Sequence, residues 1–155
     1  RTVIDERLRE REFGVFDGLT ALGIRQHYPD EAAHRTRLGK FYHRPPGGES
    51  WADVILRLRS AMNSINLHYS GRRVLIVCHQ VVVLCMRYIL EELNEVQILA
   101  IDKAGEVLNC GICAFDFEPH DLECAPRLSL WNHPARLEQS DAPVTSAPDT
   151  IAGTR

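Results

Sequence analysis

The sequence has no run of 18 or more apolar residues, so no apolar segment is long enough to span a membrane as a helix. It also lacks a signal-like hydrophobic region near its start and any internal repeat. No charge excess marks a nucleic-acid binder, because 18 Lys+Arg stand against 21 Asp+Glu for a net charge of −3. The 155 residues, 45% of them hydrophobic, fit one globular domain. The chain opens with Arg1 rather than methionine, and we therefore expect a processed chain or a fragment.

Cysteine and histidine are present, but their spacing forms no recognisable metal site. The five cysteines are an odd number, and no second C-x-x-C or spaced histidine pair completes a zinc site. Cys110 and Cys113 form one C-x-x-C inside a predicted strand, whereas a low-pKa redox cysteine typically lies at the start of a helix. A metal-binding α/β domain is therefore disfavoured. We expect reduced thiols in a cytoplasmic protein that uses no metal and no cofactor.

The first half of the chain predicts two helices with definite starts. Thr20 is placed to cap a short helix that ends at His27, ahead of a proline. Ser50 begins the clearest helix, with Asp53 placed to complete a capping box. Apolar residues then recur at spacings of three and four, at Trp51, Val54, Leu58, Ala61 and Ile65. The polar and basic residues 31–49 have no clear period, and we interpret them as a long functional connection.

The second half predicts a buried strand followed by a buried helix. Residues 74–78 are apolar without interruption, as in a strand of a parallel sheet that is covered on both faces. Residues 81–93 are apolar nearly all round and predict a crossover helix. Two further strands and a disordered tail are expected over residues 108–117, 127–132 and 138–155. This order of elements favours one α/β domain over residues 1–137.

His79 and Glu10 are the first candidates for chemistry. His79 directly follows the predicted strand 74–78 and precedes a helix, and ligands of open α/β sheets bind at such strand ends. The helix start can hold an anion such as phosphate. Glu10 is a carboxylate among arginines beside a glycine turn, which alone is more typical of a surface charge cluster than of a catalytic group. Glu49, just ahead of a capped helix, is expected to be structural, paired with an arginine or with the helix start.

Three blocks of the sequence resemble the histidine phosphatase superfamily, the phosphoglycerate mutase-like proteins. The first, Arg7-Leu8-Arg9-Glu10 with the Phe13–Thr20 segment, is similar to the family's R-L-x-E block and the glycine-rich segment after it. Gly48-Glu49-Ser50 is similar to its G-E-S block, and Val74–Gln80 to the strand that carries its second histidine. The blocks occur in the family's order and cover about residues 1–137. The resemblance implies a mostly parallel sheet flanked by helices.

The Cys-His-Gln form of the third block is most similar to the fructose-2,6-bisphosphatase branch. That resemblance implies contacts to a second phosphate or a sugar from four residues, namely Arg35, Lys40, Trp51 and Gln80. Ala21 stands where that branch carries a substrate tyrosine, so the implied substrate is a small phosphorylated metabolite, without further identity. Nucleic acid and membrane are not among the expected partners.

The family's Arg-His-Gly tripeptide, whose histidine is the nucleophile, does not occur among the 155 residues. We therefore expect a domain that lacks its N-terminal strand and helix. In an intact protein the resemblance implies a phosphohistidine intermediate, with Glu10 as acid and base and His79 stabilising the phosphoryl oxygens. Phosphatase and mutase activity both fit. The alternative is a truncated, non-catalytic domain that binds a phosphorylated ligand or a protein.

Overall fold

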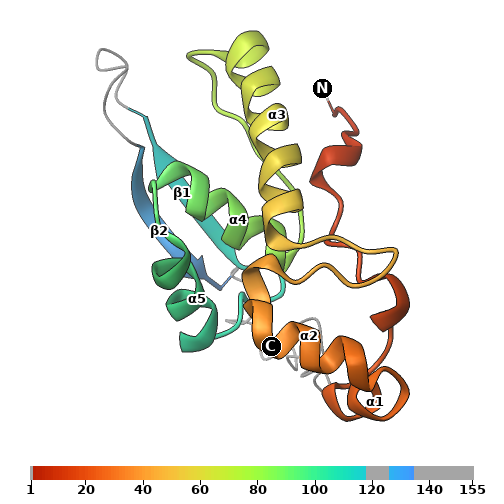
Figure 1. The fold of residues 1–155 in the computed structure, drawn as a ribbon. Coiled ribbons are helices and arrows are strands. Elements are labelled where there is room, and N and C mark those ends of the chain that lie inside the picture. The colour runs from red at the N-terminus through yellow and green to blue at the C-terminus, as the bar shows by residue number, and fades with distance from the viewer. Residues whose placement is uncertain (1, 118–125, 135–155) are drawn as a thin grey trace.

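The computed structural model describes residues 2–117 and 126–134. This part of the chain is mostly helical and ends in a pair of strands (Figure 1). In chain order the elements are η1 (Glu6–Leu8), η2 (Gly14–Phe16), α1 (Ala21–His27), α2 (Pro29–Tyr42), α3 (Trp51–Tyr69), α4 (Gln80–Leu90), α5 (Glu95–Ala104), β1 (Ile112–Asp116) and β2 (Arg127–His133). The expected tail, residues 138–155, lies outside the described residues. No helix in the described ranges is long and apolar enough to cross a membrane.

Helix α3 is the central element of the fold and starts where the sequence predicts. Ser50 Oγ accepts a hydrogen bond from the Asp53 amide at 3.2 Å, and the Asp53 carboxylate accepts one from the Ser50 amide at 2.8 Å. This confirms the capping box, which satisfies backbone donors that a helix start leaves without partners. The apolar stripe faces inward, and Trp51, Val54 and Leu58 are fully buried. Helix α3 packs against α4, α2 and η1.

Helix α4 provides the other half of the core. It buries Val81, Val82, Leu84, Cys85 and Met86 against α3, which confirms the predicted apolar helix. Helix α5 packs against α4 and contributes the fully buried Ile98. The sequence does not predict a helix over residues 95–104. Because α5 buries only Ile98, its sequence carries a weak apolar pattern. The signal that could have found it is a second capping box, between Asn94 and Gln97.

Residues 31–49 differ from the expected irregular connection, because most of them belong to α2. Pro29 occupies the first turn of α2, where its missing N–H has no partner to lose, and Asp30 and Glu31 favour the positive helix start. Only Phe41 of this helix is buried, so the sequence carries no apolar stripe that would predict it. Gly39 interrupts the helix with φ 79° and ψ 164° and introduces a kink.

The segment 74–78, expected as a buried strand, is not paired with any strand in the described ranges. Ile76 and Cys78 pack partly against the core, whereas Leu75 and Val77 are 88% and 84% exposed. The prediction of burial on both faces is therefore wrong for the described chain. An apolar run is buried only where neighbouring strands and helices cover it, and those neighbours are not local in sequence.

The two later strands are confirmed, and they form an antiparallel pair. In β1 and β2, Ala114 lies opposite Leu130 and Phe115 opposite Leu128. The expected parallel pairing is absent from the sheet that the described residues form, which consists of these two strands. The strand pair lies next to α4 and α5 (Figure 1), and Arg87 of α4 stacks over the Trp131 ring at 4.2 Å.

Candidate active site

The fold brings Glu10 and His79 to one place. His79 is the residue that precedes α4, with an extended backbone at φ −119° and ψ 172°. The Glu10 carboxylate accepts a hydrogen bond from the Val81 amide, in the first turn of α4, at 3.4 Å. Its other oxygen accepts one from the Arg11 amide at 2.8 Å. The two residues predicted to act together therefore lie at the same helix start, although 69 positions separate them in the sequence.

Arg57 holds the backbone that carries Glu10. Its guanidinium, on α3, donates to the carbonyl oxygens of Arg7 at 2.6 Å and of Glu10 at 3.3 Å. It also donates to both carboxylate oxygens of Glu49, at 2.8 and 3.0 Å. This agrees with the structural role expected for Glu49. Burial alone would raise the pKa of Glu49, but the bonds from Arg57 and the Glu12 amide outweigh it and hold that pKa below its usual value.

A close backbone approach holds the loop before α3 against the segment after Glu10. The Val15 amide donates to the Pro46 carbonyl at 3.0 Å, and the Glu49 amide donates to the Glu12 carbonyl at 2.9 Å. Gly14 allows this approach, because a Cβ there would lie 2.1 Å from the Pro46 oxygen. The two blocks that resemble the family are therefore joined backbone to backbone.

The start of α4 is suited to an anion. Its first-turn amides and the positive end of its dipole point toward the position of His79 and Glu10. The His79 residue is exposed, so its imidazole is accessible to a ligand from solvent. Gln80 is the first residue of α4, half-buried beside His79. A phosphate bound here would meet amides, an imidazole and a carboxyl group.

A cluster of three basic side chains, Arg11, Arg35 and Lys40, is the second feature of the site. Burial lowers the pKa of Arg11 to about 10, and the positive charge of Arg35 contributes to that shift. Burial likewise lowers the pKa of Lys40; its bond to Asp102 opposes this, and Arg35 and Arg11 add to the lowering. The three charges are thus close enough to repel one another in a partly dehydrated environment. Such a cluster favours a polyanionic ligand.

Arg11 is the functional candidate that sequence reasoning missed. It is only 7% exposed and donates to the Glu49 carbonyl at 2.6 Å and to the His43 carbonyl at 3.4 Å. In the sequence it is one of three alternating arginines at positions 7, 9 and 11, which is typical of a solvated charged segment. No feature of the neighbouring sequence indicates that Arg11 is the buried arginine of the three. Its approach to Arg35 depends on the tertiary fold.

Lys40 and Trp51, both expected substrate contacts, lie together. The Lys40 ammonium pairs with the Asp102 carboxylate of α5 at 2.6 Å and lies 5.4 Å from the centre of the Trp51 ring. Trp51 is fully buried, and its ring packs against Phe41. Its indole N–H has no hydrogen-bond partner among the described residues. The direct contact of Trp51 with substrate stays a prediction.

The thiols near the site are poor nucleophiles. Burial raises the pKa of Cys78 to about 11 and that of Cys85 to about 12, and Glu10 adds to both increases. Both residues therefore stay protonated at neutral pH. Cys110 and Cys113 are also free thiols in the described part of the chain. Away from Glu10 and His79, three residues of the described chain could hold a metal ion, namely Glu31, His34 and His43.

A family model matches nearly the whole described chain. It is the model of the histidine phosphatase superfamily (branch 1), and it covers residues 1–133. The chain belongs to the histidine phosphatase superfamily. It has the α/β fold of that family, of which the described residues supply mainly helices and the two-stranded sheet.

Relatives of this histidine phosphatase chain include enzymes that act on phosphorylated metabolites. Human 6-phosphofructo-2-kinase/fructose-2,6-bisphosphatase 3 is 38% identical over 79 residues, which are 51% of this chain and 14% of that protein. Bacillus stearothermophilus YhfR has the same fold, with a TM-score of 0.68 at 22% identity over 86% of this chain and 62% of that one. The mycobacterial glucosyl-3-phosphoglycerate phosphatase gives a TM-score of 0.65 at 27% identity over 84% and 65%. The histidine phosphatase chain spans about a fifth or less of the length of the curated relatives it matches.

Proposed function

We propose that this chain carries the acid–base and phosphate-binding part of a histidine phosphatase. The substrate would be a small phosphorylated metabolite, a sugar phosphate or bisphosphate, and the reaction would pass through a phosphohistidine. The observation that carries the proposal is the Glu10 carboxylate bonded at the start of α4, directly after His79. A proton donor and an anion-binding helix start then face the same bound phosphate.

In the proposed reaction a histidine nitrogen attacks phosphorus, forming an N–P bond as the P–O bond to the alcohol breaks. Glu10 gives its proton to the departing alkoxide. Water then attacks the phosphohistidine, Glu10 takes a proton from that water, and phosphate leaves with the histidine restored. His79 and the α4 amides would stabilise the phosphoryl oxygens during both transfers. No Arg-His-Gly occurs in the sequence, so in this proposal the nucleophile belongs to residues outside the 155.

The basic cluster would bind the non-reacting end of the substrate. Arg35 and Lys40 come from α2 and Arg11 from the segment after Glu10, so two elements converge on one ligand. Asp102 already pairs with Lys40, and a second phosphate would add negative charge beside Arg11 and Arg35. This supports a substrate with two anionic groups over a simple monophosphate.

Arg35→Ala is expected to weaken binding of a bisphosphate by about 10-fold or more, because one charge-assisted contact to the second phosphate is lost. Binding of fructose 2,6-bisphosphate and of p-nitrophenyl phosphate to the chain would be measured by titration calorimetry. The monophosphate should lose little affinity. Arg37→Ala is the matched control, since Arg37 is an exposed arginine on the same helix. Equal losses for both ligands would contradict the assignment of Arg35 to a second anionic group.

The catalytic proposal is tested by comparing this chain with the encoded protein. The 155 residues alone are expected to release no phosphate from p-nitrophenyl phosphate, because the nucleophile is missing. The full encoded protein, with its N-terminus determined by intact mass, should turn over and show an acid-labile phosphoenzyme. Turnover by the 155 residues would contradict the assignment of the nucleophile. A full protein that binds phosphate esters without turnover would instead support the non-catalytic ligand-binding domain.

A further inference from the structure

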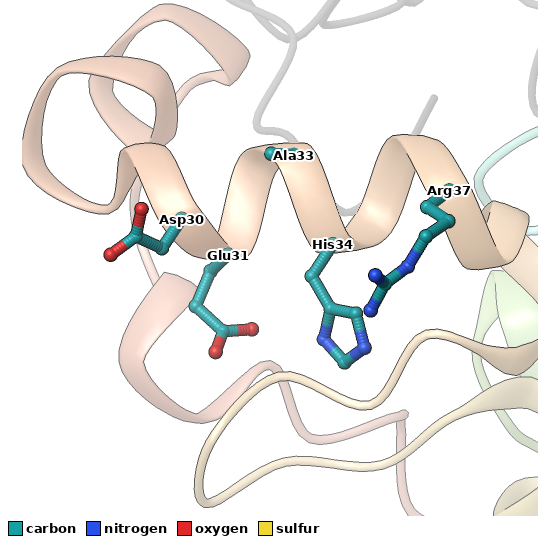
Figure 2. Close-up of a pocket in the computed structure, with 5 residues that line it drawn as sticks. All are labelled: Asp30, Glu31, Ala33, His34 and Arg37. Atoms are coloured by element: carbon teal, nitrogen blue, oxygen red, sulfur yellow. The ribbon is translucent and has the colours of Figure 1, made fainter.

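A cluster of metal-ligating side chains lies at the two ends of α2, away from Glu10 and His79. Glu31 and His34 are three residues apart on one face of the helix, and Figure 2 shows their side chains pointing the same way. His43 follows the last turn of α2 and places its Nε2 atom 3.2 Å from a Glu31 carboxylate oxygen. One ligand atom from each of the three residues lies within 4.8 Å of the others.

The site is partly built and partly open. His43 is only 1% exposed, and its ring stacks on Phe16 with centroids 5.7 Å apart. The ring of His34 meets His43 edge-on at 5.6 Å and also lines an open pocket of about 490 Å³. Glu31 borders the same pocket. One ligand is therefore held by packing, while the other two can adjust from the solvent side.

The spacing suits a divalent ion with short ligand bonds. Zinc binds imidazole nitrogen and carboxylate oxygen at about 2.0–2.2 Å in a tetrahedron, so ligand atoms around one ion lie about 3.4 Å apart. The three ligand atoms lie within 4.8 Å of one another, so they must close by at most about 1.4 Å. A rotation of His34 at its accessible end can supply that closure. The pocket leaves room for water as a fourth ligand.

We propose that Glu31, His34 and His43 bind a divalent transition-metal ion of the zinc type. Two imidazoles and one carboxylate form a ligand set that prefers such ions over calcium or magnesium, which take oxygen ligands. The ion would join the first turn of α2 to the residue after its last turn, across the kink at Gly39. The site shares no ligand residue with Glu10, His79 or the basic cluster, although Arg11 of that cluster donates to the His43 carbonyl at 3.4 Å.

Of the charged residues around the site, Asp30 favours a bound cation, whereas Arg37 opposes it. The Glu31 carboxylate, 3.2 Å from His43 Nε2, supplies negative charge beside the two imidazoles. Asp30 adds negative charge at the pocket. Arg37 lines the same pocket, and Arg35 lies near enough to His43 to add to the lowering of its pKa that burial causes. Those cations would favour an anion on the open coordination position.

The test is titration of the metal-free chain with Zn²⁺ against a chromophoric chelator, followed by Co²⁺ substitution. We expect one equivalent per chain, a rise in Tm with Zn²⁺, and visible Co²⁺ bands of nitrogen–oxygen coordination. His34→Asn should weaken Zn²⁺ binding by at least about 100-fold, since even residues that only support metal ligands contribute 10- to 100-fold. Glu31→Gln should act alike. Neither residue is fully buried, so both variants are expected to fold without metal.

Two control variants separate this site from others in the chain. His68→Asn removes an exposed histidine on α3 and should leave Zn²⁺ affinity unchanged. A Cys110→Ser/Cys113→Ser variant should also keep its equivalent of Zn²⁺ and lack any sulfur-to-cobalt charge-transfer band. Unchanged affinity in folded His34→Asn and Glu31→Gln variants would overturn the proposal. So would loss of the ion in the double cysteine variant, or a Co²⁺ spectrum dominated by thiolate.

Discussion

Glu10→Gln is expected to lower kcat for an alkyl phosphate by about 10²- to 10⁴-fold in the catalytically competent protein that the proposed function requires. Glutamine keeps the size of the side chain and an oxygen that can accept from the Val81 amide, but it has no proton of suitable acidity to give. Steady-state kinetics with an alkyl phosphate would measure the loss. The affinity for inorganic phosphate, measured by inhibition, should stay similar.

The leaving group distinguishes acid catalysis from a general structural effect. The p-nitrophenolate anion departs without protonation, so the Glu10→Gln variant should lose much less on p-nitrophenyl phosphate than on an alkyl phosphate. Glu12→Gln is the matched control, because Glu12 is an exposed carboxylate two residues further on, bonded to Arg9 at 3.1 Å. An equal loss on both substrates, or the same loss in the Glu12→Gln variant, would reject the assignment of Glu10 as the acid.

Arg57→Ala is expected to lower the free energy of unfolding by about 3 kcal/mol. The side chains of Arg57 and Glu49 are only 12% and 13% exposed, so removal of the guanidinium leaves a nearly buried carboxylate with its main partner gone. The carbonyls of Arg7 and Glu10 lose a donor as well. Urea denaturation followed by circular dichroism would measure the change.

Two further variants decide how the Arg57 effect arises. Arg59→Ala, which removes an exposed arginine on the same helix, should change the free energy of unfolding by less than about 0.5 kcal/mol. Adding Glu49→Gln to Arg57→Ala should recover part of the loss, because the stranded charge is removed. Because alanine has a higher helix propensity than arginine, equal losses in the Arg57→Ala and Arg59→Ala variants would contradict the buried contact as the source of the effect.

Much of the helical core could be predicted because its signals are local. The capping box at Ser50 and the apolar stripe after it lie within a few turns of one helix, and both are present in the structure. The same holds for the apolar helix α4. The meeting of Glu10 and His79 was implied by the family resemblance, and the hydrogen bond between Glu10 and Val81 agrees with it.

The rest depends on contacts between distant residues. Whether the apolar segment 74–78 is covered depends on strands elsewhere, and no pattern within the segment reports their presence. Arg11 and Arg9 have the same local environment in sequence, yet only Arg11 is buried, under carbonyls 32 and 38 positions away. Helix α2 buries a single side chain, so its sequence shows almost no helical periodicity of apolar residues. A single sequence carries little information on burial that distant residues decide.

The kink at Gly39 determines how the side chains of Arg35 and Lys40 are oriented relative to each other. On an unbroken α-helix two residues five positions apart, such as Arg35 and Lys40, point about 140° away from each other around the axis. Because the helix is interrupted at Gly39, the Lys40 side chain does not follow the helical periodicity, and it can point to the same ligand as Arg35. With φ 79° and ψ 164°, position 39 has a backbone shape open essentially to glycine alone. Adding or deleting one residue at this turn would shift Lys40 and the buried Phe41 relative to Arg35, so the proposed binding of a second anionic group depends on the length of this turn.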